Sequence, residues 1–237
     1  MNVIEYTSSW TAYLALLVLP LCVFLPFNLV RFAWGYRNGL KPMPTEVLMR
    51  AERVDQLVWP FQHATILGLV ILLMAHQKVS PAQVGIHRDR WQISLALGIT
   101  AGLLLVATQG LIWKVVPSVM AAREEFENAR GSAMLWCANY MVGAFSEELW
   151  LVFCLVALRK AGYPLSVAVL VPSIAFGSAH FTYRLGALAV AIKGSFSCFL
   201  FLATGSILAP YLFHFLGNLG ALYWARRGAA LARRDGV

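Results

Sequence analysis

Two adjacent acidic residues lie deep inside an apolar run of the sequence. Glu147 and Glu148 come about a dozen residues into the predicted helix 133–158. One ionised side chain at the centre of a membrane helix costs about 2.5–3.5 kcal/mol on insertion scales. Such side chains face a bundle interior or a wet cavity, and they are candidates for function. Neighbouring helical positions lie about 100° apart, so we predict that one glutamate faces a site and the other makes a structural contact.

Two later apolar runs carry histidines at the spacing of one helical turn. Phe176 and His180 are four residues apart, as are His214 and Asn218, so each pair shares a face of its helix. A single membrane histidine is usually a hydrogen-bonded packing residue. Three helices that each bring Glu, His or Asn to bear favour a shared site instead.

Two further polar residues in predicted spans are weaker candidates. His63 is an isolated polar residue in the span 57–75, and we predict a hydrogen-bonded packing role for it. Lys193 lies in the span 185–205, where it could pair with a membrane acid or extend to the interface. We predict that its role is structural.

The composition requires a membrane. Of the 237 residues, 59% are hydrophobic and only 13% are charged, and the mean hydropathy is +0.68. A soluble domain carries about 25% charged residues. No linker, repeat or low-complexity tract divides the chain, so we predict one integral membrane domain over residues 1–237.

The elements that must position these residues are membrane helices. The apolar runs are long enough to span a bilayer and lack the alternation of a barrel strand. We predict an all-α, polytopic transmembrane bundle of about seven spans, with a range of six to eight. The predicted spans are 10–32, 57–75, 91–113, 133–158, 164–181, 185–205 and 206–224.

Charge and cysteine placement bound the partners and the topology. The net charge is +8, and Lys and Arg concentrate after the first span, between the third and fourth spans, and in the tail. This predicts an external N-terminus and a cytoplasmic C-terminus in the inner or plasma membrane. Scattered basic residues favour contact with lipid and not with nucleic acid. The cysteines, none in a CxxC pattern, are predicted to be buried hydrophobes and not disulfides or zinc ligands: Cys22, Cys137, Cys154 and Cys198.

Taken together, Glu147-Glu148, Phe176-x-x-x-His180 and His214-x-x-x-Asn218 resemble the CPBP family, the CAAX-type intramembrane endopeptidases and bacteriocin-processing relatives. Its motifs are EExxxR, FxxxH and HxxxN, in this order. About thirty residues separate the first two motifs here and about thirty-four the last two. The resemblance covers roughly 91–224, which would be the catalytic core. The chain departs from the first motif at one place, because Val152 stands where the family has arginine.

The resemblance implies proteolysis of a membrane-anchored peptide or protein by a glutamate-activated water. Glu147 would be the general base, His180 would hold and polarise the water, and His214 and Asn218 would donate hydrogen bonds to the oxyanion. Glu148 would support the site, and Phe176 would pack its wall.

No cofactor is expected, although the same residues leave a zinc interpretation open. Glu147, His180 and His214 could bind the metal, while the HExxH pattern of zinc peptidases is absent. The substrate could be a prenylated CAAX tail, a leader peptide or a C-terminal sorting anchor. Two other hypotheses remain: a non-catalytic scaffold or immunity relative, which Val152 favours, and a proton-coupled carrier. Lys193 or Arg184 could replace the missing arginine.

Overall fold

The computed structural model describes residues 45–87, 89–115, 133–180 and 185–234, and this part of the chain is helical without any strand. The all-α prediction is therefore confirmed. The structure has these elements: α2 (Thr45–His76), the 3₁₀-helix η1 (Pro81–Val84), α3 (Trp91–Val115), α5 (Ala133–Lys160), α6 (Leu165–Ala179), α7 (Leu185–Thr204) and α8 (Leu208–Arg234).

Within the described residues, four helices are long and apolar enough to cross a membrane. They are α2, α3, α5 and α7, while α6 is a shorter apolar helix of 15 residues. α8 falls outside this group because polar residues, His214 and Asn218 among them, lower its mean hydropathy. The first predicted span, 10–32, lies outside the described residues. The protein is an integral membrane protein, and the number of seven spans stays a prediction.

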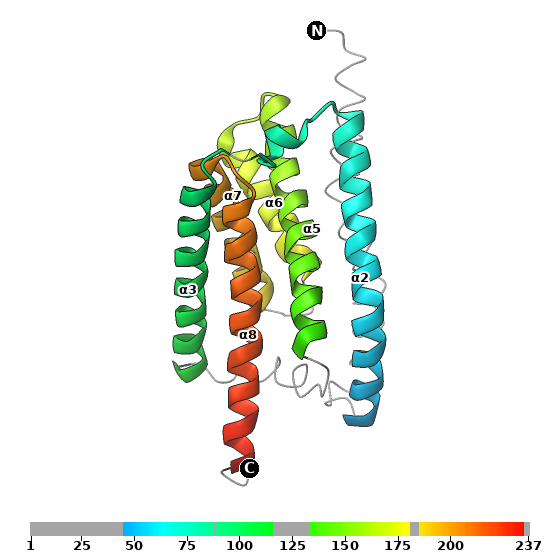
Figure 1. The fold of residues 1–237 in the computed structure, drawn as a ribbon, viewed down its shortest axis with the longest axis vertical. Coiled ribbons are helices and arrows are strands. Elements are labelled where there is room, and N and C mark those ends of the chain that lie inside the picture. The colour runs from blue at the N-terminus through cyan, green and yellow to red at the C-terminus, as the bar shows by residue number, and fades with distance from the viewer. Residues whose placement is uncertain (1–44, 88, 116–132, 181–184, 235–237) are drawn as a thin grey trace.

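α5 is the central helix of the bundle. Of the apolar stretch of α5 that could cross a membrane, 78% is buried inside the protein, against 22% for α2, 17% for α3 and 28% for α7. It packs against α2 on one side and against α6, α7 and α8 on the other, and Figure 1 shows α2 at the edge of the bundle beside it. Large apolar side chains such as Phe61, Leu103 and Leu188 are exposed on the outer helices, as expected for a surface that faces lipid.

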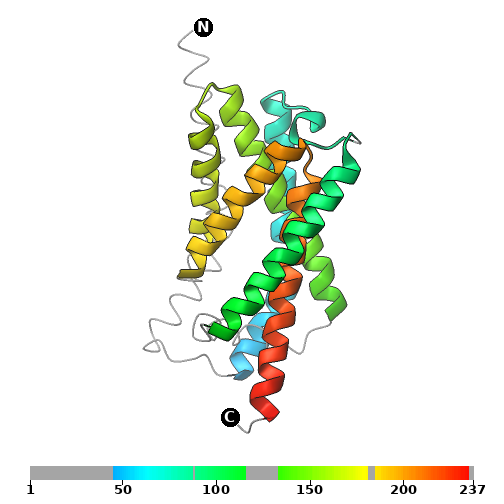
Figure 2. The ribbon, with the colours of Figure 1, turned by 90° about the vertical axis from the view of Figure 1, so that its left-hand side faces the viewer.

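Small residues let α3 and α8 approach closely along their length. A β-carbon added to Gly98 would lie 2.7 Å from the carbonyl oxygen of Ala209, and one added to Gly217 would lie 2.5 Å from Leu105. Close backbone approach through glycine is typical of helix pairs in membranes. Figure 2 shows these two helices side by side, with α7 running obliquely past them.

α7 and α8 form a tight hairpin at residues 204–207. Gly205 takes the left-handed backbone conformation with φ of 69°, and the Thr204 hydroxyl accepts from the Ser206 amide at 3.2 Å. Two contacts from the η1 segment clamp the turn: His87 Nε2 donates to the Gly205 carbonyl at 2.8 Å, and the Ile207 amide donates to the Gly85 carbonyl at 3.3 Å. The hairpin therefore has a fixed register.

Candidate active site

The two glutamates of α5 face helices α7 and α8 from the buried centre of the bundle. Glu147 is 7% exposed and Glu148 is 0% exposed. The residues after them, including Trp150, Leu151 and Phe153, are core residues with almost no exposure. This packing fixes the rotation of α5 and with it the directions of both carboxylates.

His214 of α8 lies between the two carboxylates. Its Nδ1 donates a hydrogen bond to Glu148 Oε1 at 2.6 Å, and its Nε2 lies 3.2 Å from Glu147 Oε2. The imidazole is only 2% exposed. A neutral imidazole carries a proton on one nitrogen only, so it can donate to one of the two carboxylates. The contact with the other carboxylate is stabilised by a second proton, which lies on the ring or on one of the carboxyl groups. In either form the three groups carry one net negative charge in a buried place.

Glu148 is sealed inside the protein and holds His214 in place. Its Oε1 also accepts a hydrogen bond from Ser197 Oγ of α7 at 2.9 Å. Its Oε2 is buried and has no hydrogen-bond partner within the described part of the chain. Glu147 is the less buried of the two carboxylates. This difference fits the prediction that one acid faces the site and the other has a structural contact.

His180 caps the C-terminal end of α6, next to Phe176. Its Nδ1 donates to the Phe176 carbonyl at 2.8 Å, which leaves the Nε2 of a neutral ring as an acceptor. The buried Phe176 ring lies edge-on to both histidines, with centroids 4.8 Å from His180 and 6.0 Å from His214. His180 is half-buried and close enough to interact electrostatically with His63 and His214.

Asn218 lies one turn after His214 on α8 and pairs with Lys193 of α7. Lys193 Nζ donates to Asn218 Oδ1 at 3.4 Å. The ammonium group is close enough to interact electrostatically with Glu147, Glu148 and His214. Of the two structural roles expected for Lys193, the structure therefore gives it a place beside the membrane acids.

Val152 occupies a fully buried position in the apolar core cluster around α5. The side chain that would be arginine in the EExxxR motif thus contributes only packing. Among the described residues, Lys193 is a cation close enough to interact with both glutamates. Arg184 lies outside the described residues.

Sequence reasoning gave His63 a packing role and did not single out Ser197, yet both lie in the site. His63 of α2 is fully buried, and its Nε2 lies 3.9 Å from Glu147 Oε1. The predicted hydrogen bond of His63 is present, to Ser146, but its neighbour is the candidate base. Ser197 could have been found from the hairpin, because it lies four residues after Lys193 and as far from the turn as His214 does.

The arrangement of the polar residues does not fit a metal ion. No three His, Cys, Asp or Glu residues of the described ranges are grouped so that they could hold one. Both nitrogens of His214 are directed at carboxylates, and Glu148 Oε1 accepts two hydrogen bonds. We therefore derive no step through a metal.

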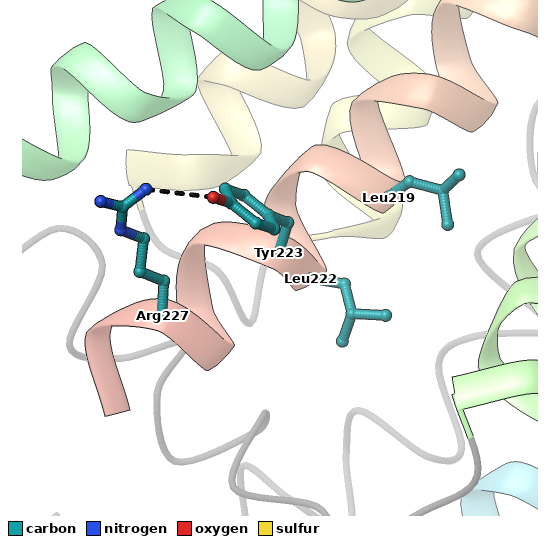
Figure 3. A pocket seen from close by; sticks show the side chains of 4 residues that line it. All are labelled: Leu219, Leu222, Tyr223 and Arg227. Atoms are coloured by element: carbon teal, nitrogen blue, oxygen red, sulfur yellow. Dashed lines mark hydrogen bonds between the residues drawn. The ribbon is translucent and has the colours of Figure 1, made fainter. Parts of the chain in front are cut away.

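An open pocket on α8 lies away from these residues. Leu219, Leu222, Tyr223 and Arg227 line it, and Figure 3 shows the Arg227 guanidinium donating to the Tyr223 hydroxyl, at 3.0 Å. Arg227 follows His214 by thirteen residues, about 20 Å along a helix. Among the described residues, no acid or histidine lines this pocket, and it is not the candidate site.

Comparison with known proteins supports the resemblance that the motifs indicate. Residues 129–220 match the family model described as type II CAAX prenyl endopeptidase Rce1-like. No curated protein and no solved structure matches the chain. The matching segment is thus similar to CAAX endopeptidases, in agreement with the CPBP resemblance that the motifs carry. This segment contains both glutamates, His180, His214 and Asn218, and α2 with His63 lies before it.

Proposed function

We propose that the protein is an intramembrane endopeptidase that hydrolyses a peptide bond close to a membrane anchor. The observation that carries the proposal is the His214 ring between Glu147 and Glu148, inside a segment that matches the CAAX prenyl endopeptidase family. The clustering of these groups at one place favours hydrolysis over a carrier, whose ionisable groups would follow a path across the membrane.

Glu147 is the proposed general base. It takes a proton from water, and the water oxygen bonds to the carbon of the scissile carbonyl. When the tetrahedral intermediate collapses, the carbon–nitrogen bond breaks and the proton held by Glu147 passes to the leaving nitrogen. The choice of Glu147 over Glu148 is supported by burial, because Glu148 is completely enclosed and tied to His214 and Ser197.

His180, His214 and Asn218 complete the proposed chemistry. His180 accepts a hydrogen bond from the attacking water through Nε2, since Nδ1 is engaged by the Phe176 carbonyl. With the second proton on the His214 ring, Nε2 turns its hydrogen from Glu147 to the oxyanion once Glu147 is protonated. The Asn218 amide also donates to the oxyanion, and such donors are worth about 3–4 kcal/mol each when removed singly. Lys193 supplies the positive charge that the motif arginine supplies elsewhere in the family, and it orients Asn218 through its oxygen.

The proposed substrates are membrane-anchored peptides in the inner or plasma membrane, with the C-terminus of the protease in the cytoplasm. The description of the matching family makes a prenylated CAAX tail the first substrate to test. Leader peptides and C-terminal sorting anchors are the next two classes.

The test is cleavage of anchored peptides by the purified protein in liposomes. Wild type is compared with Glu147→Gln, with His214→Ala and with Asp89→Asn, a matched control in an exposed carboxylate. The proposal predicts cleavage by wild type and the control and none by the other two. Equal cleavage by Glu147→Gln would contradict it. A folded wild type that cleaves no peptide of the three classes would favour a non-catalytic relative, the candidate that Val152 supports.

A further inference from the structure

His63 is brought to the candidate site by a helix outside the matching segment. α2 packs against α5, and His63 points from it toward Glu147 with no exposed surface. Nε2 of His63 lies 3.9 Å from Glu147 Oε1, while Nε2 of His214 lies 3.2 Å from Glu147 Oε2. The two oxygens of the candidate base therefore face two different histidines.

The hydrogen bond to Ser146 sets the protonation of the His63 ring. The Ser146 hydroxyl donates to the Gly143 carbonyl at 3.0 Å, so its oxygen accepts from Nδ1 of His63 at 2.7 Å. A neutral His63 then carries its proton on Nδ1 and presents a lone pair at Nε2. This lone pair is directed to the side of Glu147.

The packing around His63 leaves the ring little freedom. Trp59 lies edge-on to it, with ring centroids 4.3 Å apart. A β-carbon added to Gly143 would lie 3.2 Å from His63 Nε2 and 3.0 Å from Trp59, so glycine makes room for both rings. The sequence thus places His63 on α2, and its hydrogen-bond partner Ser146 and the space-making Gly143 on the adjoining α5.

Among the described residues, α6, α7 and α8 also bring charged or titratable groups near His63 or near its neighbours Glu147 and His214. His180 and His214 are near enough to interact with it electrostatically, and Lys193 acts on Glu147 and His214. A protonated His63 would be repelled by the positive charge of Lys193. A neutral His63 ring, which accepts a hydrogen bond from a protonated carboxyl, avoids this repulsion.

We propose that His63 is a positioning residue that accepts a hydrogen bond from Glu147 after this glutamate has taken the proton of the attacking water. The oxygen Oε1 and the nitrogen Nε2 close from 3.9 Å to hydrogen-bond distance in that step. His63 thereby holds the protonated carboxyl in place until the tetrahedral intermediate collapses. The hydrogen bond from Oε1 to Nε2 then breaks, and the same proton passes to the leaving nitrogen. The inference rests on the proposed function.

The kinetic test compares His63→Ala, His63→Asn and His63→Gln with His76→Ala, a control at an exposed histidine of the same helix. Asparagine can keep the bond to Ser146 but cannot reach Glu147, whereas glutamine can reach it. We expect kcat to fall about 100-fold in the alanine and asparagine variants, because misplacement of a reacting group by about 1 Å has this effect. KM should change much less, and glutamine should restore part of kcat.

A second measurement separates a failed inference from a failed function. Glutamate labelled with ¹³C at the side-chain carboxyl is observed by NMR, and the Glu147 signal is assigned by its loss in Glu147→Gln. His63→Asn should shift this signal and its pH dependence, and His76→Ala should not. If wild type cleaves but His63→Asn keeps kcat and the Glu147 signal, the inference is wrong. If nothing cleaves but the signal shifts, the contact stands and the proposed function falls.

Discussion

Glu148 accepts a hydrogen bond of 2.6 Å from Nδ1 of His214, across 66 residues of sequence. The carboxylate is fully buried, so the bond is protected from water. It fixes which nitrogen of His214 carries the proton toward Glu148 and which nitrogen faces Glu147. A buried aspartate gives the histidine of a serine protease the same orientation.

Glu148→Gln should reduce kcat by at least about 100-fold with little change in KM, because the amide keeps the shape but loses the charge that orients His214. Peptide cleavage in liposomes measures kcat and KM, and thermal unfolding in detergent shows whether the variant keeps its fold. Ser197→Ala is the matched control, since it removes a hydrogen bond from the same oxygen and leaves His214 in contact. A Glu148→Gln enzyme at the wild-type rate would show that the bond to His214 has no catalytic consequence.

Lys193→Met should lower cleavage strongly, whereas Lys193→Arg should keep much of it. Methionine retains the packing of the side chain but removes both the positive charge near the glutamates and the partner of Asn218. The comparison is made on kcat with a peptide that wild type cleaves. Equal loss in both variants would point to the shape of the lysine side chain and not to its charge.

Val152→Arg should destabilise the protein and not activate it. Val152 has 0% exposure within the apolar core, so the longer, charged side chain of arginine would have to enter a packed apolar cluster. A buried unpaired charge costs several kcal/mol, so the unfolding temperature should fall well below that of Val152→Ile. An arginine variant with unchanged unfolding and faster cleavage would mean that α5 can turn this residue toward the glutamates.

Gly177→Ala should destabilise the contact between α6 and α7 and reduce cleavage. The new β-carbon would lie 2.6 Å from the Ala187 carbonyl oxygen and 2.6 Å from the Ala191 β-carbon, so the helices must separate. The shift moves His180, which follows three residues later. Gly68→Ala is the control, because nothing lies within 4 Å of its added β-carbon. Unchanged unfolding and cleavage in Gly177→Ala would argue against this close approach.

Removal of metal ions should leave cleavage intact. The imidazole and carboxylate groups of the site bind one another, and none of the described side chains form a metal-holding set. Activity is measured before and after dialysis against a chelator, with a zinc peptidase as the positive control for chelation. Loss of activity that zinc restores would contradict the proposed mechanism and make Glu147 and His214 ligands.

The sequence predicted the helices better than their contacts. Five of the predicted spans begin within a few residues of helices in the structure, because long apolar runs end at polar or turn residues such as Gly162 and Gly205. α2 starts earlier than predicted, at Thr45, and α8 continues to Arg234, since a helix can extend beyond the apolar part of its sequence. η1, a single short turn, has no such signal.

In the candidate site too, the positions within each helix were predictable and the contacts between helices were not. Spacing within one helix predicts that His214 and Asn218 share a face, but it cannot predict which residue of another helix they meet. Asn218 meets Lys193, and His63 reaches Glu147, because helix packing brings together residues that are far apart in sequence. Hairpin register was the unused signal: Lys193 and Asn218 lie equally far from the two ends of the turn at residues 204–207.

The clamped turn between α7 and α8 links the two hydrogen-bond partners of Glu148, which are Ser197 and His214. Ser197 on one arm and His214 on the other are equally distant from that turn, so a tilt of the hairpin moves both donors together. The two hydrogen bonds to Glu148 are therefore formed or broken as a pair. A substitution that loosens the turn at residues 204–207 is therefore expected to weaken both hydrogen bonds to Glu148, and not one of them alone.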